Sequence, residues 1–333
     1  AEGDANLLAD TLVSADRRGV HSHGVLRVPE YVKKLTHGVD PQGRPAVVQD
    51  TGACLVVDSG NSMGQIGAHF AMHHVIERAR TTGIAAAAVR GSNHCGAMAY
   101  YAMQALPDDM IGLATTNALP TMAPWGGAER LLGINPLAVA VPAGGELPIV
   151  YDAAFSATAH GKLRVYHQKG LTLPEGWALD EQGSPTTDPA AALNGLLMPI
   201  GGFKGTALAL IMGLLSSMLS GAAYGTELGT MEEGPRPGQD GHFCAAIRVG
   251  AFEEVARFKA RVDGAIRQLH ACRPAPGFDR IYAPGELEFA TEARSNRDGI
   301  SLSRETLADL EGVARTYDLD VRLDVWLDVR PLH

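Results

Sequence analysis

Helical and extended segments follow one another in this chain without the regular strand–helix–strand alternation of an all-parallel sheet. Apolar residues recur at helical spacing over about 6–15, 28–35 and 66–79. Runs typical of strands cover 84–89, 110–115, 137–141 and 149–152. The last three strands succeed one another with no helical pattern between them. This order favours an α/β or α+β fold with a mixed sheet.

The C-terminal part of the chain adds further helices, one strand and an alternating tail. The apolar stretch 206–219 predicts a buried core helix, and 242–249 predicts a strand. Amphipathic helices are expected over 252–270, with Phe252, Val255, Val262, Ile266 and Leu269 on one face, and over 304–317, where Ser303 suits an N-cap. From 318 to 330, apolar and polar residues alternate strictly. That tail predicts one strand, paired within its own sheet or with a neighbouring subunit.

Composition limits the classes of partner. The 333 residues, 46% of them hydrophobic, can bury one large core or two smaller ones. The formal net charge is −9 and no basic block is long enough to follow a phosphate backbone, so we expect no nucleic-acid partner. No apolar run approaches the roughly 18 residues of a membrane span. The scattered cysteines, with no C-x-x-C pair, are typical of a cytoplasmic protein; they are Cys54, Cys95, Cys244 and Cys272.

The first group of residues that could carry chemistry lies between His21 and Tyr31. If a helix begins near Gly24, then His23, Arg27 and Tyr31 lie four residues apart and share one face. An imidazole that titrates near neutrality can carry a proton, and a guanidinium can hold a carboxylate. The same spacing would also result if His23 capped the helix and Arg27 formed a surface ion pair.

Two glycine-containing loops form the second group. Ser92–Ala97 follows a buried strand, and the amides of Gly96 and Ala97 could face a pyrophosphate at a helix start. Gly201–Gly205 contains three glycines and Lys204, which indicates close backbone approach to an anion. It is not a P-loop, because the G-x-x-x-x-G-K-[ST] spacing is absent. Ordinary turn chemistry explains either loop equally well.

The residues alone therefore indicate an α/β enzyme with a His/Arg site and leave other classes open. No G-x-G-x-x-G follows a strand and opens a helix, so a Rossmann domain is not expected. A metal-dependent hydrolase or lyase could use His21, His23 and His94 as ligands. A non-catalytic module that binds a small molecule or a protein would also account for the glycine loops.

Taken together, ordered segments of the chain resemble the malate/L-lactate dehydrogenase-like family. This family also includes ureidoglycolate, sulfolactate and 2,3-diketogulonate oxidoreductases and the Δ1-piperideine-2-carboxylate reductases. The matching segments are 15–24, 91–97, 116–118, 123–127, 133–138, 151–156, 185–189 and 201–205. Each is weak alone, but their order along nearly the whole chain makes coincidence a poor explanation.

The resemblance implies an α/β fold with a mixed-sheet, non-Rossmann cofactor domain. It assigns 91–287 to NAD(P) binding, and 1–90 with 288–333 to substrate binding and dimerisation. The implied activity moves a hydride between the nicotinamide of NAD or NADP and C2 of a small 2-hydroxy or 2-oxo acid of the malate, lactate or ureidoglycolate type. Reduction of a cyclic 2-imino acid is the alternative within the family. Members are typically homodimers with the active site at a domain and subunit junction.

The resemblance also implies residue roles, none of them in metal binding. His23 matches the acid/base histidine with Ser22 bonded beside it, and His94 is the proton acceptor proposed for some members. The substrate would contact Arg27, Tyr31 and His160. The cofactor would contact His94, Cys95, Gly96, Ala97, Ala118, Asp152, Ala153, Ala154, Phe203, Lys204, Pro284, Gly285 and Glu286.

Three positions depart from the family pattern. Lys162 stands where the cyclic-imine reductases carry an aspartate, and a charged lysine cannot accept a hydrogen bond from a histidine. Cyclic imines are therefore less expected as substrates. Cys95 replaces a usual aromatic residue and Ile134 a usual threonine, which indicates a reshaped nicotinamide pocket and leaves NAD versus NADP open.

Overall fold

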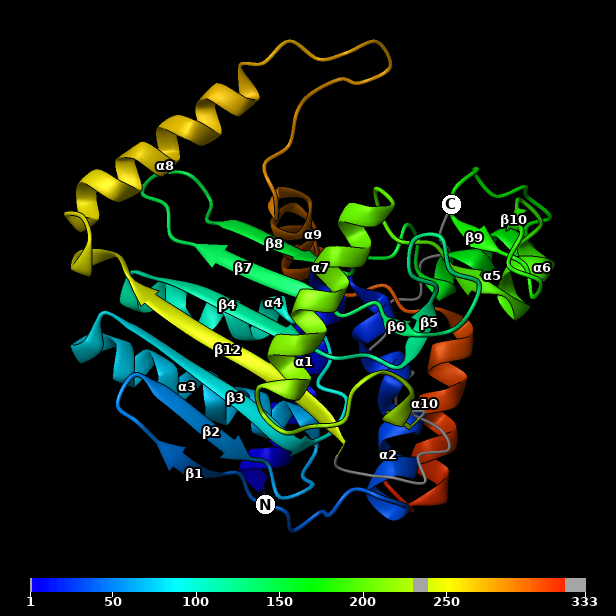
Figure 1. Ribbon diagram of the computed structural model, residues 1–333, viewed down its shortest axis with the longest axis horizontal. Coiled ribbons are helices and arrows are strands. Elements are labelled where there is room, and N and C mark those ends of the chain that lie inside the picture. The colour runs from blue at the N-terminus through cyan, green and yellow to red at the C-terminus, as the bar shows by residue number, and fades with distance from the viewer. Residues whose placement is uncertain (1, 230–238, 321–333) are drawn as a thin grey trace.

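A seven-stranded mixed sheet forms the centre of the computed structural model, which describes residues 2–229 and 239–320 (Figure 1). The strand order is β1-β2-β3-β12-β4-β7-β8. β2 and β3 are parallel, and the other neighbours are antiparallel, which confirms the predicted mixed sheet. The strands are β1 (Ala46–Asp50), β2 (Cys54–Asp58), β3 (Ile84–Ser92), β4 (Met110–Thr116), β7 (Leu137–Val141), β8 (Ile149–Ala153) and β12 (Asp240–Arg248).

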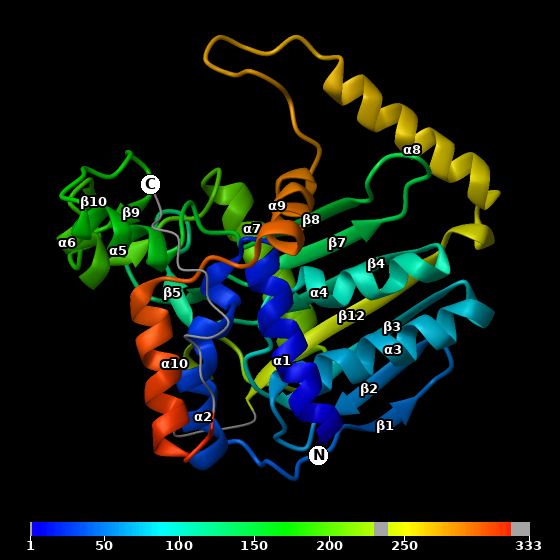
Figure 2. The same cartoon turned by 180° about the vertical axis from the view of Figure 1, so that it is seen from behind.

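Helices cover both faces of this sheet (Figures 1 and 2). On one face lie α1 (Glu2–Arg17), α3 (Gly64–Thr82), α4 (Ala99–Ala102) and α9 (Glu286–Asp298). On the other lies α7 (Phe203–Gly213), which continues into a π-helical turn over Leu214–Met218. The central strands β3 and β12 are rich in alanine, and these small side chains let α3 pack closely on the sheet through Ala68, Ala71 and Val75.

A second, five-stranded sheet has its own apolar core around Met122, Leu163 and Leu197. Its strands are β5 (Pro120–Met122), β6 (Leu132–Gly133), β9 (Ala178–Leu179), β10 (Pro185–Thr186) and β11 (Leu196–Leu197). Its helices are α5 (His160–Gln168) and α6 (Pro189–Asn194). The larger sheet pairs β3 with β12, so the predicted division into 1–90 with 288–333 and 91–287 does not follow the sheets. That division stays a prediction about binding roles.

The remaining helices lie at the edges of the molecule. α2 (Val28–Thr36) lies beside α10 (Arg304–Thr316), whose predicted cap is confirmed because Ser303 Oγ accepts a bond from Thr306 N. α8 (Val255–His270) and the segment 271–283 project away from the body (Figures 1 and 2). The alternating tail falls beyond residue 320, outside the described residues, so its pairing stays a prediction.

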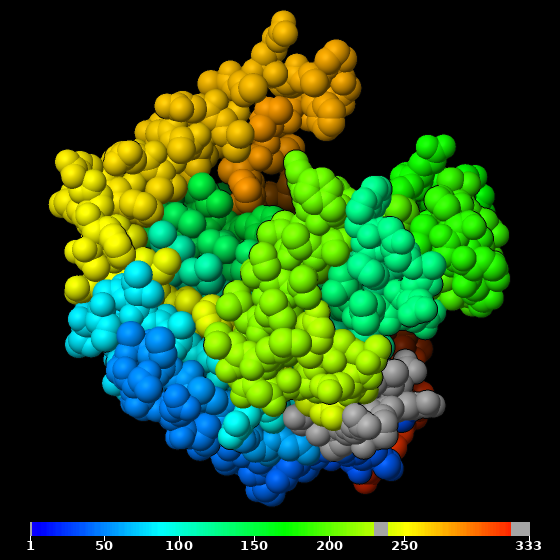
Figure 3. Space-filling model, in the orientation of Figure 1, coloured from blue at the N-terminus to red at the C-terminus, as the bar shows by residue number. Residues whose placement is uncertain are grey.

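The helix predicted over 206–219 is confirmed, but the expectation that it is a buried core helix holds for one side only. Ala209 and Met212 pack in the core of the second sheet, whereas five large apolar side chains are between 39% and 58% exposed; they are Leu208, Leu210, Ile211, Met218 and Leu219. This exposed side faces outward, as Figure 3 shows for this part of the chain. A helix that is apolar all round does not reveal which face its own chain covers.

The helix predicted over 252–270 is confirmed as α8, but most of its apolar face is uncovered. Of the five residues expected on that face only Ile266 is buried, and Phe252 is 71% exposed. One carboxylate anchors α8 to the β7–β8 hairpin, because Asp263 accepts bonds from the backbone of Gly144, Gly145 and Glu146. In the described residues no helix is long and apolar enough to cross a membrane.

Candidate active site

The helix predicted over 28–35 is confirmed as α2, but it does not extend back to Gly24, which was the condition for a face shared by His23, Arg27 and Tyr31. Residues His21–His23 and Val25–Arg27 form two separate 3-10 turns, and α2 begins only at Val28. His23 therefore does not share a helical face with Arg27 and Tyr31. The cause is Asp16, a buried residue of α1, whose carboxylate binds His21 Nδ1 at 2.8 Å and accepts a bond from Val25 N at 2.7 Å.

Gly24 is required between these two turns. A Cβ atom built on Gly24 would lie 2.1 Å from Asp16 Oδ1, so no other residue fits without moving the carboxylate. The contact also occupies His21, whose pKa is raised by its hydrogen bond to Asp16. His21 is thus engaged by α1, while His23 is left to face the middle of the molecule.

His23 and His94 form the centre of the candidate site. Their rings are stacked, with centroids 5.8 Å apart and planes 15° apart. Each Nδ1 atom has one partner: Ser22 Oγ at 2.9 Å from His23, and the Tyr31 hydroxyl at 2.8 Å from His94. Within the described part of the chain, neither Nε2 atom has a hydrogen-bond partner. Two oriented imidazoles therefore each offer one nitrogen to a ligand.

Both imidazoles are neutral at neutral pH. Burial, with the nearby charge of Arg27, lowers the pKa of His23 to about 4. Burial lowers the pKa of His94 well below its usual value, with contributions from Arg27 and Lys34. Burial also raises the pKa of Tyr31, which keeps the hydroxyl protonated. Both rings are therefore unprotonated in the free protein and can act as proton acceptors.

Arg27 both faces this pair and forms the ion pair that the sequence left open as an alternative. Its Nε donates to the Ser22 carbonyl at 2.8 Å, and its Nη1 lies 2.7 Å from Glu30 Oε2. The other terminal nitrogen, Nη2, has no hydrogen-bond partner among the described residues. The guanidinium thus retains one edge for an anion even with Glu30 bound.

Sequence reasoning missed Lys34, which lies one turn beyond Tyr31 on α2. Burial lowers the pKa of His94 and raises the pKa of Asp240; the charge of Lys34 adds to the first shift and opposes the second. In the described ranges, 2–229 and 239–320, Lys34 forms no ion pair. The spacing of Arg27, Tyr31 and Lys34, at i, i+4 and i+7, could have indicated it.

The loop between β3 and α4 holds His94 but is built differently from the prediction. Cys95 is 1% exposed and its sulfur faces Met98 and His242. Only the backbone of Cys95 could therefore contact a cofactor. The expected helix has only four residues, and the Ala99 amide donates to Asp152 Oδ2 at 2.7 Å. That amide is therefore engaged by the chain itself; the amides named in the prediction are those of Gly96 and Ala97, and their approach to a pyrophosphate stays a prediction.

Hydrogen bonds bring the other predicted cofactor segments together. Asp152 contacts the start of α4, and the Val150 amide donates to the Pro284 carbonyl at 3.0 Å. Ile200 N donates to Phe155 O, which places the glycine turn before Phe203 and Lys204 beside the end of β8. The Asn135 side chain accepts a hydrogen bond from the Ala118 amide and donates one to Ala209 O on α7. These bonds connect Ala118 to the same region.

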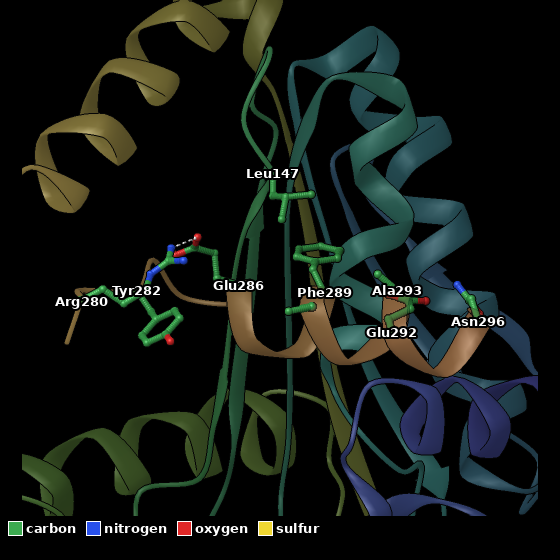
Figure 4. Close-up of a pocket in the computed structure, with 9 residues that line it drawn as sticks. Leu147, Arg280, Tyr282, Glu286, Phe289, Glu292, Ala293 and Asn296 are labelled. Atoms are coloured by element: carbon green, nitrogen blue, oxygen red, sulfur yellow. Dashed lines mark hydrogen bonds and ion pairs between the residues drawn. The ribbon is translucent and has the colours of Figure 1, made fainter. Parts of the chain in front are cut away.

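A pocket of about 440 Å³ adjoins one of these segments (Figure 4). Arg280 lies 4.4 Å from the centroid of the Tyr282 ring and pairs with Glu286 at 2.9 Å. Phe289 and Leu147 form apolar walls. Aromatic surface, a carboxylate and a guanidinium beside Pro284–Glu286 suit a nucleoside, and the volume is within the range of small-molecule sites. At Gly96, with φ +83°, a Cβ would meet no atom within 4 Å, so a ligand can approach its backbone.

Comparison with known proteins decides the family. A family model described as malate/L-lactate dehydrogenase matches residues 1–311. This chain belongs to the malate/L-lactate dehydrogenase family. The malate dehydrogenase of Pyrococcus abyssi is 38% identical over 323 residues, which cover 94% of this chain and 88% of the relative. The ureidoglycolate dehydrogenase (NAD(+)) of Escherichia coli O157:H7 is 32% identical over 300 residues, which cover 90% and 85%.

A solved structure supports the same assignment. The sulfolactate dehydrogenase of Methanocaldococcus jannaschii superposes with a TM-score of 0.91 at 35% identity, covering 96% of this chain and 92% of the other. The predicted malate/L-lactate dehydrogenase-like fold is therefore confirmed. The chain is an oxidoreductase of a family that acts on 2-hydroxy acids with NAD(P).

Two positions singled out in the sequence, His160 and Lys162, have no described contact with the His23–His94 pair. His160 begins α5. Burial, with the charges of Arg164 and Arg130, lowers the pKa of His160, and no described contact joins it to the His23–His94 pair. The ammonium of Lys162 lies 4.9 Å from the Trp177 ring centroid and so stacks on an aromatic residue. The contact of His160 with the substrate therefore stays a prediction.

The metal-dependent alternative gains no support from these geometries. His21 is turned toward Asp16, and the described residues contain no group of three histidine, cysteine, aspartate or glutamate side chains placed to share an ion.

The four cysteines predicted to form no disulfide framework are free thiols in the structure; they are Cys54, Cys95, Cys244 and Cys272.

Proposed function

We propose that the His23–His94 pair is the proton-transfer centre of an NAD- or NADP-dependent dehydrogenase that interconverts a small 2-hydroxy acid and its 2-oxo acid. The observation that carries this proposal is the pair of stacked, neutral imidazoles, each anchored through Nδ1 and open at Nε2, beside Arg27. When bound, the nicotinamide supplies or accepts the hydride at C2 of the acid.

His23 acts as the base when the hydroxy acid is oxidised. Its Nδ1–H donates to Ser22 Oγ, which leaves the lone pair on Nε2 to take the hydroxyl proton. The imidazolium formed lies near the positive charge of Arg27, which lowers the pKa of His23 in the free protein. A substrate carboxylate on Arg27 offsets this repulsion, so proton uptake becomes easier only when the acid is bound.

Arg27 holds the carboxylate next to C2 through the Nη2 edge that Glu30 leaves open. Glu30 in turn fixes the guanidinium plane, so the acid is oriented rather than merely attracted. The Tyr31 hydroxyl lies 2.8 Å from His94 Nδ1, and the Tyr31 ring lies beside the His94 ring. His94 is the second group that can accept the hydroxyl proton.

The acid carries a second anionic group. Lys34 is a basic side chain near His94 with no ion pair in the described part of the chain, whereas Arg27 is already paired with Glu30. Unpaired charge beside a ligand site is costly to desolvate unless the ligand neutralises it. Two relatives carry the names malate dehydrogenase and sulfolactate dehydrogenase, and both of those acids have two anionic groups.

The cofactor is held between the β3–α4 loop, the end of β8 and the start of α9. Gly96 offers an open backbone, and Glu286, which binds Arg280, His270 and the Ala283 amide, orders the segment beside the aromatic pocket. Asp152–Ala154 and the glycine turn before Phe203 and Lys204 complete the groove, and Ala118 lies behind it. Phe203 is 64% exposed, as a side chain that covers a ligand would be before the ligand binds.

The protein acts as a homodimer in which a second copy covers the outward face of α7. That face carries the exposed side chains of Leu208, Leu210 and Ile211, and the π-helical turn adds Met218 beside Leu219. Monomeric proteins rarely leave so many large apolar side chains exposed together. Sedimentation of the purified protein should give a dimer, and Leu208→Glu with Ile211→Glu should shift it to monomer; a wild-type monomer would refute this part of the proposal.

The decisive experiment is a turnover screen of 2-oxo acids against NADH and NADPH, following nicotinamide absorbance. We expect turnover with an acid that carries a second anionic group, such as oxaloacetate, and weaker turnover with pyruvate. Absence of oxidation of either cofactor by any 2-oxo acid, with a correctly folded protein, would refute the proposed function. Turnover with a cyclic 2-imino acid alone would assign the protein to the other branch of the family.

A further inference from the structure

A completely buried histidine on the central strand lies directly behind the His94 loop. His242 is near the start of β12, paired in register with Thr116 of β4, and has no exposed surface. Its Nε2 lies 2.7 Å from Ser92 Oγ, and its Nδ1 lies 2.8 Å from Thr116 Oγ1. The Cys95 sulfur lies 3.7 Å from the same Nδ1.

These contacts connect two segments that come from opposite sides of β12. Ser92 is the last residue of β3 and Cys95 follows it in the loop that holds His94. Thr116 is the last residue of β4 and precedes Asn117 and Ala118. One imidazole therefore contacts the ends of both neighbouring strands at the edge of the sheet where the proposed site lies.

The chemistry of this ring suits a brace rather than a proton carrier. Burial lowers the pKa of His242 to about 4, so the ring is neutral and offers one donor and one acceptor nitrogen. Ser92 Oγ has no other hydrogen-bond partner in the described residues, so it donates to Nε2. Nδ1–H then donates to Thr116 Oγ1, whose hydroxyl in turn donates a hydrogen bond to the Gly241 or Asn117 carbonyl.

We propose that His242 is a positioning residue, which fixes the His94 loop relative to the end of β4 and so sets the distance between His94 and His23. It touches no ligand and acts through Ser92 and Cys95. The inference rests on the proposed role of the His23–His94 pair. The other hydrogen bonds of the loop run to other elements: Tyr31 binds the His94 ring, Asn93 donates to Asn61 and Ser62, and the Tyr101 hydroxyl of α4 donates to the Cys95 carbonyl.

The test replaces the ring by side chains that keep one of its two bonds. An asparagine amide can reach where Nδ1 lies, and a glutamine amide can reach where Nε2 lies. We expect His242→Asn to lower kcat at least tenfold, because it loses the Ser92 tie on the His94 side. His242→Gln keeps that tie and should retain more activity. The KM values for acid and cofactor should change less than kcat.

A second measurement separates positioning from mere folding. The solvent deuterium isotope effect on kcat should increase in His242→Asn, because a displaced His94 no longer stacks correctly on His23, and proton transfer at the pair becomes slower relative to the other steps. Cys244→Ala is the matched control: Cys244 is equally buried, two residues along the same strand and on the same face. It should lower the thermal midpoint without changing kcat or the isotope effect.

Ser92→Ala keeps the test decisive if the His242 variants do not fold. It removes one bond and leaves the imidazole in place, and it should reproduce the loss of kcat and the larger isotope effect. Wild-type kcat and isotope effect in folded His242→Asn or in Ser92→Ala would overturn the inference. Failure of the wild-type protein to turn over any 2-oxo acid would overturn the proposed function instead, so the two failures are distinguishable.

Discussion

His23 and His94 face each other across the candidate site, but different parts of the chain hold them. His23 is held locally: Ser22 is its neighbour, and Asp16 fixes the two short turns around it. His94 is held by distant residues, with Tyr31 on its ring and His242 behind its loop. The first arrangement depends on one turn of backbone, and the second on the packing of the whole sheet. The two imidazoles should therefore respond differently to substitution.

The largest effect should follow removal of the His23 imidazole. If His23 takes the hydroxyl proton, His23→Ala should lower kcat by on the order of 10² or more, the usual contribution of a general base. Steady-state kinetics with the acid found in the turnover screen measure it. Ser22→Ala is a milder companion, because it leaves the ring and removes only its Nδ1 partner.

His94→Ala separates the two histidines. If His23 is the acid/base group, His94→Ala should lose less kcat than His23→Ala. A greater loss in His94→Ala, with His23→Ala close to wild type, would exchange the two roles. Equal, non-additive losses in the double variant would show that the pair acts as one unit.

Two glycines test the local arrangement against the distant one. At Gly24 an added Cβ would lie 2.1 Å from the buried Asp16 carboxylate, so Gly24→Ala should lower the free energy of unfolding by about 3 kcal/mol or more. At Gly96 the added atom meets nothing, and only the positive φ is unfavourable, at roughly 1 kcal/mol. Urea unfolding of both variants measures the difference. Equal losses would contradict the tight Asp16 contact.

The same contrast explains what the sequence could predict. His23, Arg27 and Tyr31 were found because they lie within one short segment, but their shared helical face was wrong. Two hydrogen bonds to the carboxylate of Asp16, a residue of the preceding helix, hold 21–27 in separate turns, so the helix begins at Val28 as predicted and not at Gly24. Spacing alone contains no information about such a tertiary contact.

Residues held by long-range packing gave no local signal. His242 occurs in a strand pattern that predicts burial and nothing more, and its partners in the His94 loop precede it by about 150 residues. The longer strands of the large sheet, such as β3, β4, β7, β8 and β12, were predicted because apolar runs are local, whereas the two- and three-residue strands of the second sheet were not. The extent to which α7 and α8 are buried was not predicted either, since an apolar face shows that a cover is needed but not which chain supplies it.

An intermediate effect is expected at the link between α2 and the His94 loop. Tyr31→Phe removes the hydroxyl that lies 2.8 Å from His94 Nδ1 and leaves the buried ring in place. Loss of one hydrogen bond to a buried partner, worth about 1–2 kcal/mol, should lower kcat roughly tenfold. Steady-state kinetics measure it. An unchanged kcat would show that His94 needs no orientation from α2.

A smaller and more selective effect is expected at Lys34. Lys34→Met should lower kcat/KM for an acid with two anionic groups about fivefold, and leave an acid with one group nearly unchanged, since about 1 kcal/mol of charge interaction is lost. Lys33→Met is the matched control, because Lys33 is its exposed neighbour on α2. Equal losses for both classes of acid would show that Lys34 does not contact the second group.

The smallest effect is expected for pH: kcat/KM for the hydroxy acid should hardly change across the neutral range. Oxidation requires neutral His23, whose pKa of about 4 leaves the neutral form populated throughout the neutral range. The kcat/KM for the hydroxy acid should therefore be flat above about pH 5.5 and fall toward acid with a midpoint near 4, whereas reduction, which needs the protonated ring, should slow as pH rises. Arg27 contributes to the low pKa, so Arg27→Gln should move the acid limb to higher pH. A wild-type midpoint near 6.5 would mean that neither burial nor Arg27 acts on His23, and that the local arrangement is more open than its contacts imply.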